Sequence, residues 1–180
     1  NKSVVSIDFK INKKIKRIGG KHFLISSPFT EIFKSLDPAP PKKILNTVKK
    51  LNYRNHISVQ LIVKGKTFKD NWIYVHDSSV KMARISNYNN FSKEMSYNKN
   101  IHPITVEYFV YETDDLWNFP DLDLKNFAEE ELRKTGIFLN ENKILDYFIV
   151  RSKNAYPVIK KGNDKYVNIL KNYINSFKNL

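Results

Sequence analysis

Alternating hydrophobic and polar residues predict β-strands along much of the chain. The pattern is clearest in residues 4–11, 56–63 and 104–111, in each of which every second side chain is apolar. Shorter or more polar runs predict further strands, at residues 22–26, 72–76, 82–88 and 143–151. Gly19 and Gly20 predict the turn between the first two strands. Strands that follow one another through short loops favour antiparallel pairing.

Apolar residues spaced three or four positions apart predict helices. They lie over residues 30–35, 41–51, 122–135 and 164–177. Pro41 suits a first helical turn, because the N–H groups there have no partner to lose. Strands and helices together predict an α+β fold: a mostly antiparallel (mixed) sheet of about five to six strands, with helices packed mainly on one face.

Length and composition predict a globular protein. The 180 residues are 41% hydrophobic, which suffices for a core, and a proline-rich break after residue 36 separates the first strands from the rest. There is no cysteine, so disulfides and thiolate chemistry are excluded, which fits a reducing compartment. The sequence contains no apolar run long enough to span a membrane and no signal peptide, so we expect a cytoplasmic protein.

The formal net charge of +13 raises the possibility of a polyanion partner. Only 5 of the 31 basic residues are arginines, however, and the lysines are spread along the sequence without a long block. Abundant lysine and asparagine together can reflect a compositional bias that decorates every exposed surface. We therefore do not expect nucleic acid as a partner. A stand-alone basic module that binds RNA or another polyanion remains the alternative function.

Catalytic and metal-binding patterns are missing from the sequence. The four histidines are far apart and lack metal-ligand spacing, and no glycine-rich phosphate loop or nucleophile elbow occurs. We accordingly expect no catalytic residue and no metal ligand in this chain. Two groups of residues have the chemistry of a binding site. Arg84, Ser86 and Tyr88 alternate along one strand, and Arg151 and Tyr156 flank a turn predicted over residues 151–159.

A guanidinium group can hold a phosphate or carboxylate by two hydrogen bonds, and a tyrosine adds a hydroxyl and a flat face. The alternative is a structural arginine beside a tyrosine packed in the core, and the residues alone leave both possibilities open.

From His22 onward, the chain resembles the middle of an FAD-dependent oxidoreductase. The superfamily is that of the amine oxidases, protoporphyrinogen oxidases and UDP-galactopyranose mutases. The segments that carry the resemblance are, in order, FLISSPFTEIFKSLDP, LNYRNHISVQLIV, NWIYVHD, MARISNYNNFS, VEYFVYETDDLW and RSKNAYPVI. The resemblance implies a substrate-binding domain over residues 37–180, preceded over residues 1–36 by the edge of a flavin domain or by lead-in strands. It further implies that the flavin fingerprint precedes residue 1 and that a second flavin-binding segment follows residue 180.

The resemblance also implies site residues and partners. Arg84 matches the arginine of the Arg-Ile strand of mutase-like members and is a substrate-binding candidate, and Tyr156 with Pro157 matches a Tyr-Pro step that approaches ligand and flavin in those members. Asn87, Tyr88, Tyr108 and Arg151 are further substrate-binding candidates, chosen by strand face. FAD is expected in the full-length parent but not tightly bound to this fragment. The expected partners are a small-molecule substrate, such as a nucleotide-linked sugar, and the flavin-binding domain of the same parent chain.

Overall fold

The structure is a computed structural model that describes residues 2–96, 98 and 100–180. The chain forms two compact units. The central unit is the continuous segment 53–156, and the terminal unit combines residues 1–52 with residues 157–180. The two ends of the terminal unit are joined where the N–H of Val158 donates to the carbonyl of Asn52 at 2.8 Å. Each unit has its own hydrophobic core.

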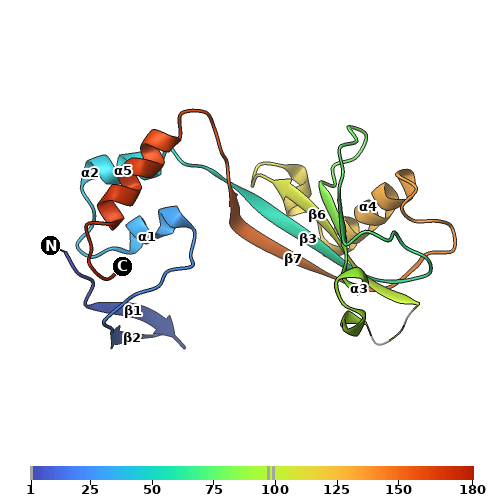
Figure 1. Cartoon of the computed structure of the whole chain (residues 1–180), viewed down its shortest axis with the longest axis horizontal. Helices are drawn as coiled ribbons and strands as arrows, with labels where there is room; N and C mark the ends of the chain where they lie inside the picture. The colour runs from blue at the N-terminus through green and yellow to red at the C-terminus, as the bar shows by residue number, and fades with distance from the viewer. Residues whose placement is uncertain (1, 97, 99) are drawn as a thin grey trace. The chain divides into compact units, whose positions relative to one another are not determined.

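The central unit is built on a five-stranded sheet with the order β4-β5-β6-β3-β7 (Figure 1). The strands are β3 (Tyr53–Lys64), β4 (Trp72–Tyr74), β5 (Arg84–Asn87), β6 (Ile101–Val110) and β7 (Lys143–Pro157). β6 pairs antiparallel with both β3 and β5, and β4 pairs antiparallel with β5. Two short helices, α3 (Tyr88–Phe91) and η1 (Lys93–Met95), follow β5. The turn η2 (Asp115–Asn118) leads into the longer helix α4 (Asp121–Lys134).

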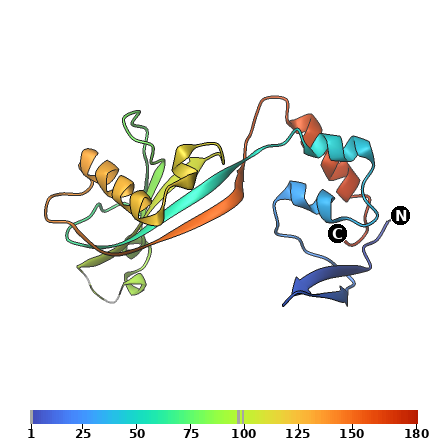
Figure 2. The same ribbon diagram turned by 180° about the vertical axis from the view of Figure 1, so that it is seen from behind.

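Helix α4 covers the apolar face of this sheet (Figure 2). Leu124, Ala128 and Leu132 recur every four residues along α4, and all three are completely buried. They contact the inward-facing residues of β3 and β6, which alternate along each strand with residues of the other face. The members from the strands are Ile57, Val59, Leu61, Val63, Ile85, Ile104, Val106, Tyr108 and Val110. The hydrophobic core of the central unit therefore lies between α4 and one face of the sheet.

The terminal unit joins a β-hairpin to three helices. Strands β1 (Ser6–Ile11) and β2 (Lys14–Gly19) form the hairpin, and helices α1 (Phe29–Ser35), α2 (Lys42–Val48) and α5 (Asp164–Ile174) share a core. The fully buried centre of that core is Phe33 with Leu170, flanked by Ile44 and Val48. Asn179 ties the two chain ends together, because its side chain bonds both the N–H and the carbonyl of Val4.

The α+β class and the mainly antiparallel five-stranded sheet confirm the fold predicted from the sequence. Three local predictions were wrong. Residues 22–26 do not form a strand: Phe23 is buried and its N–H donates to the carbonyl of Asn179, whereas Leu24 is fully exposed. The first turn lies at Asn12 and Lys13, both at positive φ, and the two glycines follow at the end of β2.

The third wrong prediction is the turn expected over residues 151–159. Strand β7 does not stop at Arg151 but continues to Pro157, so Tyr156 lies on a strand rather than in a turn. Proline is tolerated there because it is the last residue of an edge strand. Among the described residues, no helix has the length and apolar character needed to cross a membrane.

Candidate functional site

The face of the central sheet opposite α4 carries a row of polar side chains. Residues directly paired across antiparallel strands point to the same face, so the register defines the row. Arg84 on β5 pairs with Glu107 on β6, which pairs with Ser58 on β3. One step along, Ser86 pairs with Thr105, which pairs with Gln60. We call this surface the polar face, and it consists of His56, Ser58, Gln60, Tyr74, Arg84, Ser86, Thr105, Glu107 and Tyr156.

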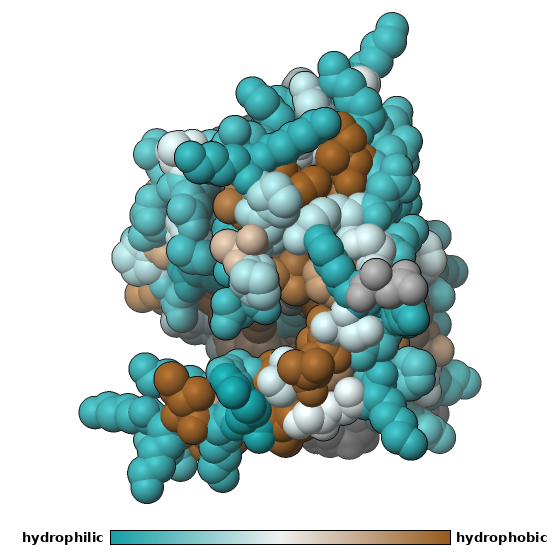
Figure 3. All heavy atoms as spheres, turned by 90° about the vertical axis from the view of Figure 1, so that its left-hand side faces the viewer, coloured by the Kyte–Doolittle hydropathy of each residue, from teal (hydrophilic) through white to brown (hydrophobic). Residues whose placement is uncertain are grey.

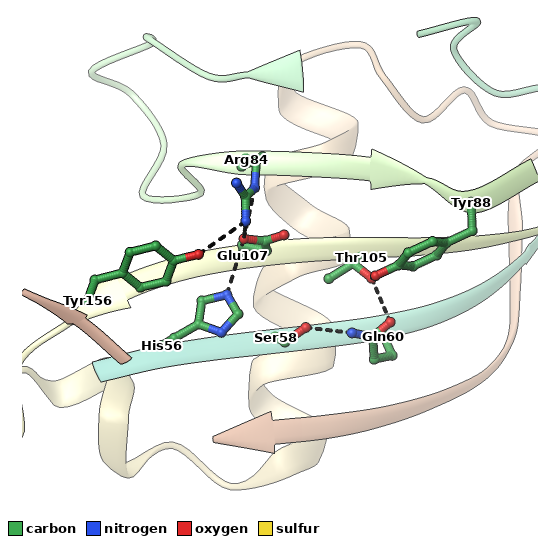
Figure 4. Close-up of polar contacts among 8 residues, drawn as sticks. All are labelled: His56, Ser58, Gln60, Arg84, Tyr88, Thr105, Glu107 and Tyr156. Carbon is green, nitrogen blue, oxygen red and sulfur yellow. Dashed lines mark hydrogen bonds and ion pairs between the residues drawn. The ribbon is translucent and has the colours of Figure 1, made fainter. Parts of the chain in front are cut away.

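Glu107 is the acceptor at the centre of the polar face (Figure 4). Its Oε2 accepts hydrogen bonds from Nε of Arg84 at 2.9 Å and from Nη2 of the same guanidinium group. Nε2 of His56 lies 3.2 Å from the same oxygen. The Glu107 side chain is only 8% exposed, whereas that of Arg84 is 25% exposed. The carboxylate therefore anchors the arginine from below and leaves part of the guanidinium group accessible.

Tyr156 brings a hydroxyl group to the same point from β7. Its phenol oxygen lies 3.4 Å from Nη2 of Arg84. The ring packs edge-on against Phe109, with centroids 4.7 Å apart, and also contacts His56 at 5.9 Å. Tyr156 remains 41% exposed. Phe109 and His56 are themselves stacked, so together they support the Tyr156 ring, part of which stays accessible.

The charges of this cluster are fixed by the contacts within it. Burial raises the pKa of Glu107, but the hydrogen bonds from His56 and Arg84 outweigh that effect and hold the pKa below its ordinary value. In return, the hydrogen bond to Glu107 raises the pKa of Arg84 above its usual range, although burial opposes the shift. At neutral pH the polar face therefore presents a permanent cation that is partly neutralised by a carboxylate.

A second polar group continues the face beyond this cluster. The hydroxyl of Thr105 donates to Oε1 of Gln60, and the amide of Gln60 in turn donates to the hydroxyl of Ser58. The hydroxyls of Thr105 and Tyr88 are 3.1 Å apart (Figure 4). Tyr88 reaches this position from the first residue of α3 and not from the strand on which it was expected. Hydroxyl and amide groups in this arrangement can bind an oxygen-rich ligand by donating and accepting hydrogen bonds.

The structure thus brings Arg84, Tyr88 and Tyr156 to one face, and it places the other predicted residues elsewhere. Tyr108 is fully buried on the α4 side, where its hydroxyl lies 3.1 Å from Glu131. Asn87 is also fully buried, and its amide donates to the hydroxyl of Thr67. Both side chains have a structural partner that explains their position. Ligand binding by Tyr108 and Asn87 stays a prediction.

Arg151 bonds to Asp121 and to the carbonyl of Phe119, at 2.6 Å in each case, so it connects β7 to the start of α4. Pro157 is the exposed last residue of β7. The roles predicted for these two residues likewise remain untested.

Sequence reasoning missed Glu107 and His56, the two residues that hold Arg84 and Tyr156. A signal was present, because Glu107 is the one charged residue in the otherwise uncharged segment 101–111. A charge in such a strand needs a partner, and the partner is supplied by the neighbouring strands. In the part of the chain that the structure describes, no group of three or more His, Asp or Glu side chains could hold a metal ion.

The fold and this face define an α+β protein whose central sheet has one apolar side under a helix and one polar side. No protein-family model matches the chain, and no curated protein sequence matches it. Solved structures do match. A reduced UDP-galactopyranose mutase aligns over 91% of this chain with a TM-score of 0.75 and 13% identity. A putative protoporphyrinogen oxidase from Exiguobacterium sp. 255-15 aligns over 98% with a TM-score of 0.67 and 12% identity.

A protein from Pyrococcus furiosus also aligns, over 81% of this chain, with a TM-score of 0.54 and 13% identity. The chain spans only 35% of the mutase, 38% of the oxidase and 36% of the Pyrococcus protein. Its resemblance to the flavoenzyme superfamily, predicted from six sequence segments, is confirmed at the level of the fold. The chain has the fold of about a third of such an enzyme.

Proposed function

We propose that the chain is the substrate-binding part of an FAD-dependent oxidoreductase or a UDP-galactopyranose-mutase-like flavoenzyme. In this proposal the polar face forms one wall of the site over the flavin, and other parts of the enzyme supply the rest of that site. Arg84 and Tyr156 bind the substrate from this wall, while Tyr156 and Pro157 approach the cofactor. A small molecule rich in oxygen, such as a nucleotide-linked sugar, is the expected substrate class.

The observation that carries the proposal is the meeting of Arg84 and Tyr156 on an accessible sheet face of a flavoenzyme-like fold. Arg84 is 25% exposed and Tyr156 is 41% exposed, and each is held in place by neighbours on the sheet. Preorganised side chains lose less conformational entropy when a ligand binds, which favours affinity. The exposure of Tyr156 differs from that expected of a tyrosine packed in the core beside a structural arginine.

The described residues fit contact with a flavin but not its retention. The exposed part of the Tyr156 ring suits packing against a flat heterocycle. A dinucleotide pyrophosphate, by contrast, needs a glycine-rich turn before a helix, and the sequence of this chain contains no such motif. When bound, FAD would supply the electron-transfer chemistry. The residues of this chain would orient the substrate and exclude water from one side of it.

The direct test is to purify the complete gene product that contains this chain and to record its visible absorption. The proposal expects a yellow protein that releases FAD on denaturation. A colourless protein that does not take up added FAD would rule the proposal out. The 180-residue chain alone serves as a matched control, because it is expected to retain little FAD.

A second test addresses the polar face in that flavin-loaded protein. Calorimetric titration with UDP-galactose as the probe should give an affinity at least tenfold lower for Arg84→Ala than for the unchanged protein, because a charge-assisted hydrogen bond is lost. Lys134→Ala is the matched control, since it removes an exposed cation from the end of α4. Equal affinities for both variants would remove Arg84 from the site. Absence of UDP-galactose binding in the unchanged protein would exclude the mutase-like substrate and leave the flavin result to stand by itself.

A further inference from the structure

The net charge of the chain belongs entirely to one of its two units. The terminal unit contains 17 of the 31 basic residues but only 4 of the 18 acidic residues, and the central unit contains 14 of each. The terminal unit therefore carries the whole formal charge of +13, while the central unit, with the polar face, is neutral. The linear sequence hides this separation, because the terminal unit is assembled from both ends of the chain.

The positive charge of the terminal unit is exposed and mostly unpaired. Every one of its 17 lysines and arginines lies at the surface. Within the described residues of this unit, only Arg17 with Asp8 and Lys34 with Glu31 form ion pairs. The central unit differs, since its arginines and lysines pair repeatedly with acids. Its ion pairs are Arg84 with Glu107, Lys125 and Arg133 with Glu129, Arg151 with Asp121, and Lys153 with Glu112.

A compositional bias towards lysine does not account for this separation. Such a bias would place an excess of lysine in both units, whereas the central unit contains equal numbers of basic and acidic residues. Clustered unpaired cations repel one another and destabilise a compact unit unless an anionic partner is present. The pattern therefore indicates a surface that meets a polyanion.

The exposed apolar residues of the same unit indicate which polyanion fits. All of them are aliphatic: Val5, Ile7, Ile11, Ile15, Ile18, Leu24, Ile25 and Ile159. Proteins that bind single-stranded nucleic acid offer aromatic platforms and arginine, but the single arginine of this unit, Arg17, is already paired with Asp8. Exposed aliphatic side chains beside lysines are instead typical of surfaces that bind an anionic lipid interface.

The β1–β2 hairpin shows the combination within one element. Ile7 pairs with Ile18 across the hairpin, and the next pairs on the same face are Phe9 with Lys16 and Ile11 with Lys14. One side of the two-stranded sheet thus carries three apolar residues along β1 and, opposite them on β2, Ile18 and two lysines. Figure 3, which faces the left-hand side of Figure 1, shows hydrophilic side chains projecting outward beside hydrophobic patches.

We propose that the terminal unit docks on the surface of an anionic lipid membrane. Its lysines would bind lipid phosphate and carboxylate groups, and the aliphatic residues of the hairpin would enter the interface. This is peripheral binding and requires no membrane-spanning segment. The proposal goes beyond the flavoenzyme function and is independent of it, because it concerns the charged unit and not the polar face.

Co-sedimentation of the 180-residue chain with vesicles tests the proposal. Vesicles of phosphatidylcholine and phosphatidylserine in equal amounts should carry the protein down, and vesicles of phosphatidylcholine alone should not. Binding should be lost in about 1 M salt, where charges are screened within roughly 3 Å. A variant with Lys14, Lys16, Lys42 and Lys43 replaced by glutamate should bind at least tenfold more weakly, since each lysine near such a surface contributes about fivefold.

The matched control reverses four exposed lysines of the central unit: Lys64, Lys66, Lys69 and Lys93. It changes the net charge equally and should keep its vesicle affinity within about twofold. Circular dichroism of both variants checks that each is folded. Equal loss of binding in the two variants would overturn the proposal, as would equal binding to neutral vesicles. Salt-sensitive binding to single-stranded RNA without binding to anionic vesicles would also overturn it, in favour of a nucleic-acid surface.

Discussion

The phenol oxygen of Tyr156 lies 3.4 Å from Nη2 of Arg84, although 72 positions separate the two residues in the sequence. They meet because β5 and β7 belong to the same sheet and both side chains lie on its polar face. Glu107 and His56, on the two strands between, support the contact from below. Four strands are therefore needed to build this cluster of four side chains.

Removing Arg84 should destabilise the protein because the buried carboxylate of Glu107 then loses its main partner. Arg84→Met deletes two of the three donors to the buried Oε2 of Glu107, which we expect to cost about 1–3 kcal/mol in the free energy of unfolding. Urea denaturation measures the loss. Adding Glu107→Gln should recover part of it, because the uncompensated charge is then absent. An additive double variant would contradict the predicted coupling.

Stability should depend on pH through Glu107 in a defined direction. Its pKa is lower in the folded protein than the ordinary value of 4.5, so the folded state favours the charged form. The stabilisation is complete above about pH 4.5 and is lost as the pH falls through the lower, folded-state pKa. Unfolding curves recorded from neutral to acid pH should therefore fall less steeply for Glu107→Gln than for the unchanged protein. Identical acid slopes would refute this assignment.

The buried carboxylate of Glu131 should contribute more to the free energy of unfolding than any single group that it binds. It accepts the N–H groups of Lys81 and Met82, and the hydroxyl of Tyr108 lies 3.1 Å away, which fastens the segment before β5 to α4. Glu131→Ala leaves these groups without a partner and should cost about 2–5 kcal/mol. Tyr108→Phe removes one hydroxyl and should cost only about 0.5–1.5 kcal/mol. Thermal unfolding of both variants shows which one loses more stability. A larger loss for Tyr108→Phe than for Glu131→Ala would contradict the prediction.

The two cores should respond separately to large-to-small substitutions. Leu170→Ala opens a cavity in the core of the terminal unit, and Leu132→Ala opens one under the central sheet, each at about 2–5 kcal/mol. Hydrogen exchange should show lost protection in α1, α2 and α5 for the first variant and in β3, β6 and α4 for the second. Uniform loss across the chain in both variants would show that the units unfold as one.

The sequence predicted the long alternating strands and the amphipathic helices because burial on one face imposes a period on their residues. It failed where that period is absent. Strand β2 is exposed along its whole length and reads as a lysine-rich loop, and its turn uses Asn12 and Lys13 at positive φ instead of glycine. The last residues of β7 are polar and end in proline, so nothing in their order distinguishes an edge strand from a turn.

The site was only partly visible for a related reason. Arg84 and Tyr156 could be chosen from residue type and resemblance, but their partners are set by strand order and register. Glu107 stands opposite Arg84 only because β5 pairs with β6, and His56 joins them because β3 lies on the other side of β6. Tyr108 illustrates the converse, since Glu107 just before it lies on the polar face while Tyr108 itself is buried on the α4 side.

The hydrogen bond from Val158 to Asn52 has an evolutionary consequence. The polypeptide leaves the terminal unit after residue 52 and returns at residue 157, and at that point entrance and exit are only a strand spacing apart. The central unit is thus an insertion at a single point in the chain of the terminal unit. Such an insertion can be exchanged or redesigned without changing the path of the surrounding chain, so the polar face and the lysine-rich surface can evolve separately.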